Sequence, residues 1–186
     1  WTQSQSNAGN QDSRPQAWAK NIISVGGVDH FNDSNPLNDS WLAGNGSTGP
    51  AQDTRSKPDL CAYYDQIWTS DLTGSDGYNT SPGVAGNSYT NFGGTSGATP
   101  IVAGYNALAI QMYTDHLFTP PRVNGGSRFV NRPFAQTVKA LQIACADMYV
   151  PTATDNRREH VGWGFPNVNN MYTRRDKITV IPENEP

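Results

Sequence analysis

The stretch Gly93-Gly94-Thr95-Ser96-Gly97-Ala98-Thr99-Pro100 decides how this chain is interpreted, because it leads straight into an apolar helical pattern. The two glycines at its start allow the backbone to turn tightly in front of a helix. Pro100 falls in the first turn, where its missing N–H breaks no helical hydrogen bond. The spacing predicts a helix over residues 96–114, buried along the stripe of Ile101, Tyr105, Leu108 and Met112.

Ser96 is the candidate nucleophile of this stretch. A serine in the first turn of a helix lies among unpaired N–H groups and at the positive end of the helix dipole, which favours an oxyanion beside it. Near the N-terminus, the segment Ser6-Asn7-Ala8-Gly9-Asn10 precedes an apolar run. The side-chain amide of Asn10 can donate a hydrogen bond to such an oxyanion. The alternative for the same pattern is a buried helix that merely begins with small residues.

Several motifs in a fixed order give the chain its resemblance to the subtilisin-like serine proteases. They are AGN at 8–10, SVGGVD at 24–29, KPDLCA at 57–62, GGTSGATPIVAG at 93–104, FAQTVKALQIACA at 134–146 and GWGFPNV at 162–168. The resemblance extends over residues 7–172, and the agreement of ordered motifs makes it more specific than any one of them. It implies an α/β fold, namely part of a doubly wound, mainly parallel sheet with flanking helices.

The resemblance also implies a set of site residues. Ser96 is expected to be the acylated nucleophile and Asn10 the oxyanion-hole amide of a peptidase that cleaves polypeptides. The residues expected to bind the substrate are Asn7, Ala8, Gly9, Gly94 and Thr95. The chain departs from the family pattern at Gly97, where a larger residue is common, and at Tyr63-Tyr64, where Pro-Gly is usual.

The histidine and aspartate of the catalytic triad are expected to lie outside this chain. In subtilisin-like enzymes the triad follows the order aspartate, histidine, serine, and both partners precede the AGN motif. Because the sequence begins at Trp1, it resembles the C-terminal half of a catalytic domain and lacks the N-terminal half. We expect the missing half to be a partner, and this half alone to be inactive.

None of the three histidines is expected to replace the missing base. His116 lies at the far end of the serine helix, roughly 30 Å from Ser96 at about 1.5 Å per residue. His30 follows a strand in a polar loop and is expected to face solvent. His160 belongs to the polar run 156–160, which is also expected to be exposed.

Composition and apolar patterning exclude some functions and predict the elements and domain division of the chain. The formal net charge of −3 favours no nucleic-acid partner, and no apolar run of about 18 residues predicts a membrane span. Strands are expected at 22–28 and 58–62, with 63–68 extending the sheet edge, and a second helix is expected to begin at Pro133 with Asn131 as its cap. Residues 1–173 are expected to form the peptidase portion, and residues 174–186 a linker or the start of an appended β domain.

Three weaker signals leave alternatives open. Asp29, Asp33 and Asp39 lie in one polar loop that either binds structural calcium, as such loops often do in the family, or is simply solvated; the irregular spacing favours the second. Sequons at Asn32, Asn38, Asn45 and Asn79 indicate either a secreted, glycosylated protein or chance. Both cysteines, Cys61 and Cys145, either form a disulfide or are small buried hydrophobes; their core positions favour the second.

Four aromatic residues, Trp18, Tyr63, Tyr64 and Trp68, are expected either to line substrate pockets or to anchor the core and loops. No cofactor is expected for the chemistry itself. The competing function is a non-catalytic subtilisin-like scaffold that retains the serine and serves as a binding or chaperone-like module.

Overall fold

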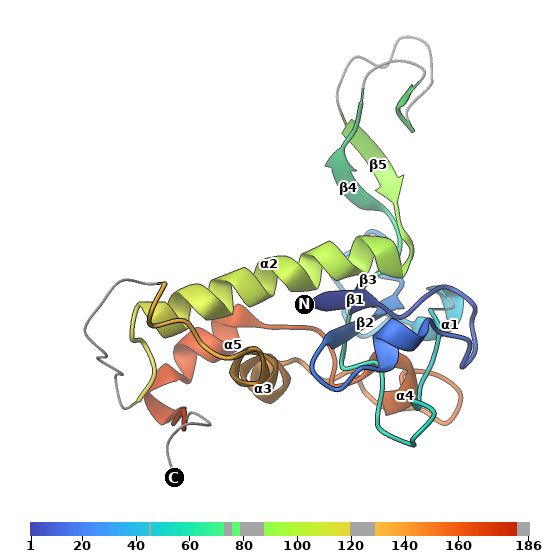
Figure 1. Ribbon diagram of the computed structural model, residues 1–186. Coiled ribbons are helices and arrows are strands. Elements are labelled where there is room, and N and C mark those ends of the chain that lie inside the picture. Colours follow the sequence, from blue (N-terminus) through green and yellow to red (C-terminus); the bar gives the residue numbers. More distant parts are fainter. Residues whose placement is uncertain (45, 73–75, 79–87, 120–128, 182–186) are drawn as a thin grey trace.

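A computed structural model places a three-stranded parallel sheet and one long helix at the centre of the molecule (Figure 1). It describes residues 1–181 except 45, 73–75, 79–87 and 120–128. The sheet has the order β1 (Thr2–Ser4), β2 (Ile23–Val28), β3 (Leu60–Tyr63). Ser4 is paired with Val25, and Val25 with Leu60. The predicted α/β class with a parallel sheet is therefore confirmed.

The central strand β2 is covered on both faces. All six of its residues are buried, as its continuous apolar run predicts. One face packs on helix α2 (Gly94–Thr114), which contacts all three strands. The other face, through Val28, packs against Trp41 of α1 (Trp41–Gly44) and Val161 of α4 (Arg158–Val161).

Helix α2 ends at Thr114 as predicted and begins at Gly94, two residues before the predicted start, but its buried face differs from the predicted stripe. The fully buried residues facing the sheet are Ala98 and Val102, whereas Leu108 is 44% exposed. Small side chains face the strands because the helix lies close against the sheet, and the larger ones are left at its sides. No helix in the described ranges is both long and apolar enough to cross a membrane.

The C-terminal half of α2 packs against two further helices. These are α3 (Ala135–Cys145) and α5 (Val168–Thr173), which lie beside it in Figure 1. The predicted start of α3 at Pro133 is wrong by two residues: the helix begins at Ala135, and Phe134, not Asn131, occupies the N-cap position. After the short turn η3 (Arg175–Lys177), Val180 packs into the same apolar cluster. The division of the chain after residue 173 stays a prediction.

Strands β4 (Ile67–Ser70) and β5 (Ser88–Phe92) form a separate antiparallel pair that projects from the body beside the start of α2 (Figure 1). The prediction that residues 63–68 extend the main sheet is wrong beyond Tyr63, the last residue of β3. The carboxylate of Asp65 accepts hydrogen bonds from the backbone N–H groups of His30 and Phe31, which turns the chain out of the sheet after β3.

A buried ionic network joins β2, β3 and α3. One carboxylate oxygen of Asp59 accepts hydrogen bonds from the Lys57 ammonium at 2.7 Å and the Ser24 backbone N–H at 2.8 Å. The other oxygen lies 2.7 Å from Nζ of Lys139 on α3. Lys57 is 1% exposed and Asp59 6% exposed, so each charge depends on the others for compensation.

The two cysteines behave as the sequence predicts. Cys61 on β3 and Cys145 at the end of α3 are both free thiols in buried positions. Burial raises the pKa of the Cys145 thiol above its ordinary value, which keeps it protonated and unreactive at neutral pH.

Candidate functional site

Ser96 is the third residue of α2, and it is exposed. The turn in front of it brings the chain against the end of β3, because the backbone N–H of Gly94 donates to the carbonyl of Tyr64 at 2.7 Å. Gly94 has φ +75°, and a Cβ there would lie 3.0 Å from the amide nitrogen of Asn7. A Cβ on Gly93 would lie 2.5 Å from the Tyr64 carbonyl oxygen. Both glycines are therefore required for the approach that presents Ser96.

The segment after β1 is tied directly to the start of the serine helix. The backbone N–H and the hydroxyl of Thr95 both donate to Oδ1 of Asn7, at 2.9 and 2.8 Å. Thr95 is fully buried, while Ser96 beside it faces outward. The structure thus brings Asn7, Gly94 and Thr95 together, although they are predicted from two separate motifs. The expectation that they bind substrate stays a prediction.

Asn10 lies three residues further along the same segment and is exposed. Its Oδ1 accepts a hydrogen bond from the backbone N–H of Asp12 at 2.8 Å, and its carbonyl accepts one from Thr48 at 2.8 Å. The first bond holds the side-chain amide by its oxygen, and the second holds the backbone of Asn10. In the described part of the chain its Nδ2 donates to no acceptor, so the N–H groups are available to a ligand. Ala8 and Gly9, the remaining predicted residues, form the loop between Asn7 and Asn10.

Two of the three histidines lie elsewhere than predicted. His30 is not solvent-facing: its Nδ1 lies 2.6 Å from Asp65 Oδ1, and its ring stacks on Tyr63. His160 is 4% exposed and stacks on Trp41, with ring centroids 3.8 Å apart. Its burial, and secondarily Arg157, lowers the pKa of its imidazole. His116 follows the far end of α2 as predicted.

The aspartate loop is also less solvated than predicted. Asp29 and Asp39 are 8% and 5% exposed, so the solvated interpretation is wrong for both; Asp33 is exposed. The described residues hold no group of three acidic, histidine or cysteine side chains suited to a metal ion, and structural calcium stays an untested expectation.

The sequons at Asn32 and Asn38 are exposed, whereas Asn45 and Asn79 lie outside the described residues.

Asp29 carries a buried carboxylate whose Oδ2 has no hydrogen-bond partner among the described residues. Burial raises the pKa of this carboxyl from 3.8 to about 6, and Asp65 adds to the rise. A carboxyl whose pKa is higher in the folded state stabilises the fold at low pH, and this stability is lost as the pH rises from about 4 through about 6.

We therefore predict that Asp29→Asn gains stability relative to the wild type as the pH rises. The difference in unfolding free energy between variant and wild type should increase by about 3 kcal/mol between pH 3.5 and pH 7.5. Urea unfolding of both proteins at the two pH values measures it. A difference that stays constant with pH would show that this carboxyl titrates normally.

Steric contacts surround Gly97 and Tyr64, two of the residues that depart from the family pattern. A Cβ on Gly97 would lie 2.5 Å from Cδ1 of Ile67 and 3.3 Å from Phe92, so the base of the β4–β5 pair occupies the space of a larger side chain. Tyr64 packs over Gly27 and Gly44, leaving no room for a Cβ at either position. Among the predicted pocket aromatics, Trp68 is 75% exposed on β4, and Tyr63 lines a cavity described below.

Comparisons with known proteins identify the family and the fold. A sequence model of the subtilase family matches residues 3–164. No curated protein sequence matches the chain. Three solved structures share the fold at low identity. The prenylagaramide maturation protease PagA gives a TM-score of 0.60 at 18% identity, over 96% of this chain and 50% of that one.

The other two are a lanthipeptide protease and fervidolysin from Fervidobacterium pennivorans, a keratinolytic enzyme related to subtilisin. The lanthipeptide protease gives a TM-score of 0.59 at 18% identity, over 92% of this chain and 49% of that one. Fervidolysin gives 0.59 at 20% identity, over 92% of this chain and 22% of that one. This chain therefore spans half or less of the length of these relatives.

Proposed function

Because the chain belongs to the subtilase family, we propose that it supplies the nucleophile and the oxyanion hole of a serine endopeptidase. In this reaction the Ser96 hydroxyl attacks the scissile carbonyl of a polypeptide and forms an acyl-enzyme, which water then hydrolyses. The observation that supports it most is the exposed serine in the first turn of α2, joined through Thr95 and Asn7 to the segment that carries Asn10.

The two donors proposed for the oxyanion are the backbone N–H of Ser96 and the side chain of Asn10. The N–H belongs to the first turn of α2, where backbone donors have no partner within the helix. The Asn10 Nδ2 is free of acceptors in the described residues, while its Oδ1 is held by Asp12. Because its oxygen is already held, the amide loses little conformational freedom when its N–H groups bind an oxyanion. This suits a preorganised donor.

We further propose that a companion N-terminal half supplies the histidine base and the aspartate. In the described residues no histidine bonds to Ser96; His30 and His160 are engaged with Asp65 and with Arg157. The sheet also supports a companion, since β1 is an edge strand paired with β2 alone in the described residues, and Trp1 is 85% exposed. An unpaired edge of this kind accepts a further strand.

Active-site labelling with a fluorophosphonate tests the proposal and separates it from the scaffold alternative. The complete protein that contains this chain should be labelled on Ser96, and Ser96→Ala should not be labelled. A non-catalytic scaffold predicts no labelling of either protein under native conditions, because an unactivated serine hydroxyl is a poor nucleophile at neutral pH.

Asn10→Ala should lower kcat by about 10²–10³ with little change in KM, because the amide is proposed to bind the oxyanion and not the ground-state peptide. Steady-state peptide hydrolysis by the complete protein measures both constants. Gln11→Ala is the matched control: its amide is also exposed and in the same loop, but it donates to the Pro50 carbonyl. An equal loss in both variants would assign the effect to the loop and not to the oxyanion.

A further inference from the structure

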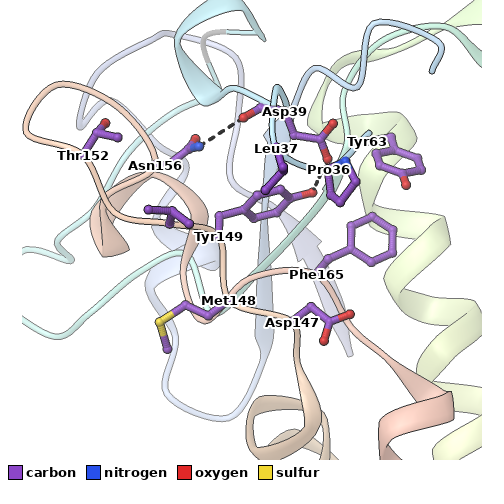
Figure 2. A pocket seen from close by; sticks show the side chains of 11 residues that line it. Pro36, Leu37, Asp39, Tyr63, Asp147, Met148, Tyr149, Thr152, Asn156 and Phe165 are labelled. Carbon is purple, nitrogen blue, oxygen red and sulfur yellow. Dashed lines mark hydrogen bonds between the residues drawn. The ribbon is translucent and has the colours of Figure 1, made fainter. Parts of the chain in front are cut away.

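A cavity of about 550 Å³ lies beside the end of the edge strand β3 (Figure 2), and neither Ser96 nor Asn10 is among the residues that line it. Its walls come from four parts of the chain: the loop after β2, the end of β3, the segment after α3 and the start of the segment leading to α5. Tyr63, Tyr149 and Phe165 supply aromatic surface, and Leu37 and Met148 supply aliphatic surface. A mostly apolar cavity with a few polar groups is the usual form of a small-ligand site.

The charged groups that line this cavity are carboxylates alone. They are Asp39 and Asp147, and the lining contains no lysine, arginine or histidine. Asp147 is satisfied within the fold, since its two oxygens accept hydrogen bonds from the side-chain amides of Asn167 and Asn170, each at 2.6 Å. Asp39 is left as the carboxylate available to a ligand.

Asp39 is 5% exposed, and no lysine, arginine or histidine pairs with it in the part of the chain that the structure describes. Its Oδ2 accepts one hydrogen bond, from the neutral phenol of Tyr149 at 2.7 Å (Figure 2), and it makes no ion pair within the described residues. Burial raises the pKa of this carboxyl, and Asp33 and Asp65 add to the rise, while Tyr149 and His30 lower it. A cation bound beside this carboxylate would compensate its buried negative charge.

We propose that this cavity binds an alkylammonium group, with the ammonium at Asp39 and the aliphatic chain against the rings of Tyr63, Tyr149 and Phe165. The ligand class follows from the two kinds of lining. The apolar walls exclude a small hydrated ion, and the Asp39 carboxylate selects a cation over a neutral aliphatic chain. A lysine side chain of a polypeptide and a free alkylamine share this chemistry.

Saturation-transfer NMR on the complete protein tests the site with pentylamine at pH 7.5, against 1-pentanol as the neutral probe of similar length. Pentylamine should receive saturation and pentanol should not. Asp39→Asn should weaken pentylamine binding at least about tenfold. The matched control is Asp33→Asn, which removes the same charge from a neighbouring but exposed residue and should bind as the wild type does. Equal binding of both probes, or equal binding by both variants, overturns the proposal.

A second variant keeps the test valid if Asp39→Asn does not fold. Met148 lines the cavity but is 56% exposed, so Met148→Lys adds an ammonium at the rim without burying it in the core, and it should displace pentylamine. Unchanged binding by this variant also contradicts the proposal. The peptide acetyl-Gly-Lys-Gly-amide, added to the Ser96→Ala protein, distinguishes the two sources of the ammonium. If the peptide displaces pentylamine, the cavity accepts a polypeptide lysine. If pentylamine stays bound, the cavity accepts free amines alone.

Discussion

Ser96→Ala should abolish peptide hydrolysis by the complete protein, with kcat reduced by about 10⁶-fold. The expected loss is this large because the nucleophile and its base act as a unit, and the remaining oxyanion donors supply only a small residual rate. Steady-state hydrolysis of a fluorogenic peptide, with assays extended to hours for the variant, measures the effect.

Ser34→Ala is the control for this substitution, because Ser34 is also an exposed serine and lies in the loop after β2. It should leave kcat unchanged. The assignment of Ser96 is contradicted if the Ser96→Ala protein, shown to be folded by its thermal unfolding, hydrolyses the peptide at a rate comparable to the wild type.

Asp59→Ala should lower the free energy of unfolding by about 3–5 kcal/mol. The substitution removes the carboxylate that compensates Lys57 and Lys139, and it leaves the Lys57 ammonium buried without an ionic partner. It also removes the acceptor of the Ser24 backbone N–H on β2. Urea unfolding of the complete protein measures the loss.

The same change at an exposed ion pair provides the comparison. Asp53 lies 2.7 Å from the Arg55 guanidinium, a pair of the same length in a solvated loop. Asp53→Ala should cost much less than Asp59→Ala, because water screens the pair and solvates the arginine left behind. Equal losses in the two variants would show that burial of the Asp59 network contributes nothing.

The sequence predicted the elements whose pattern is local. The continuous apolar run of β2 and the glycine-led start of α2 both appear where expected, since each depends on neighbouring residues alone. The buried face of α2 was predicted less well. Apolar residues surround much of this helix, and the side that faces the sheet is the one that carries Ala98 and Val102.

The features that the sequence did not predict depend on residues far apart in the chain. His30 is held by Asp65, which lies 35 residues further on, and the imidazole of His160 is buried by Trp41. A polar run around a histidine gives no sign of such partners. The link between Asn7 and Thr95 spans 88 residues, and it shows how the two predicted motifs meet.

The cavity at Asp39 has the same long-range origin. Asp39 and Tyr149 are 110 residues apart, and their hydrogen bond forms only because the segment after α3 returns to the edge of the sheet. In the sequence, Asp39 belongs to a loop rich in aspartate and asparagine, where a solvated carboxylate is the expected state. Neither spacing nor composition distinguishes it from the exposed Asp33.

A crystal structure of the complete protein with a peptide boronic acid tests the proposed site most directly. We expect a bond between boron and Oγ of Ser96, with one boronate oxygen about 2.7–3.1 Å from both Nδ2 of Asn10 and the backbone nitrogen of Ser96. A boronate bound elsewhere, or one whose oxygens are out of hydrogen-bond reach of the Asn10 amide, would contradict the assignment of these two residues to one reaction centre.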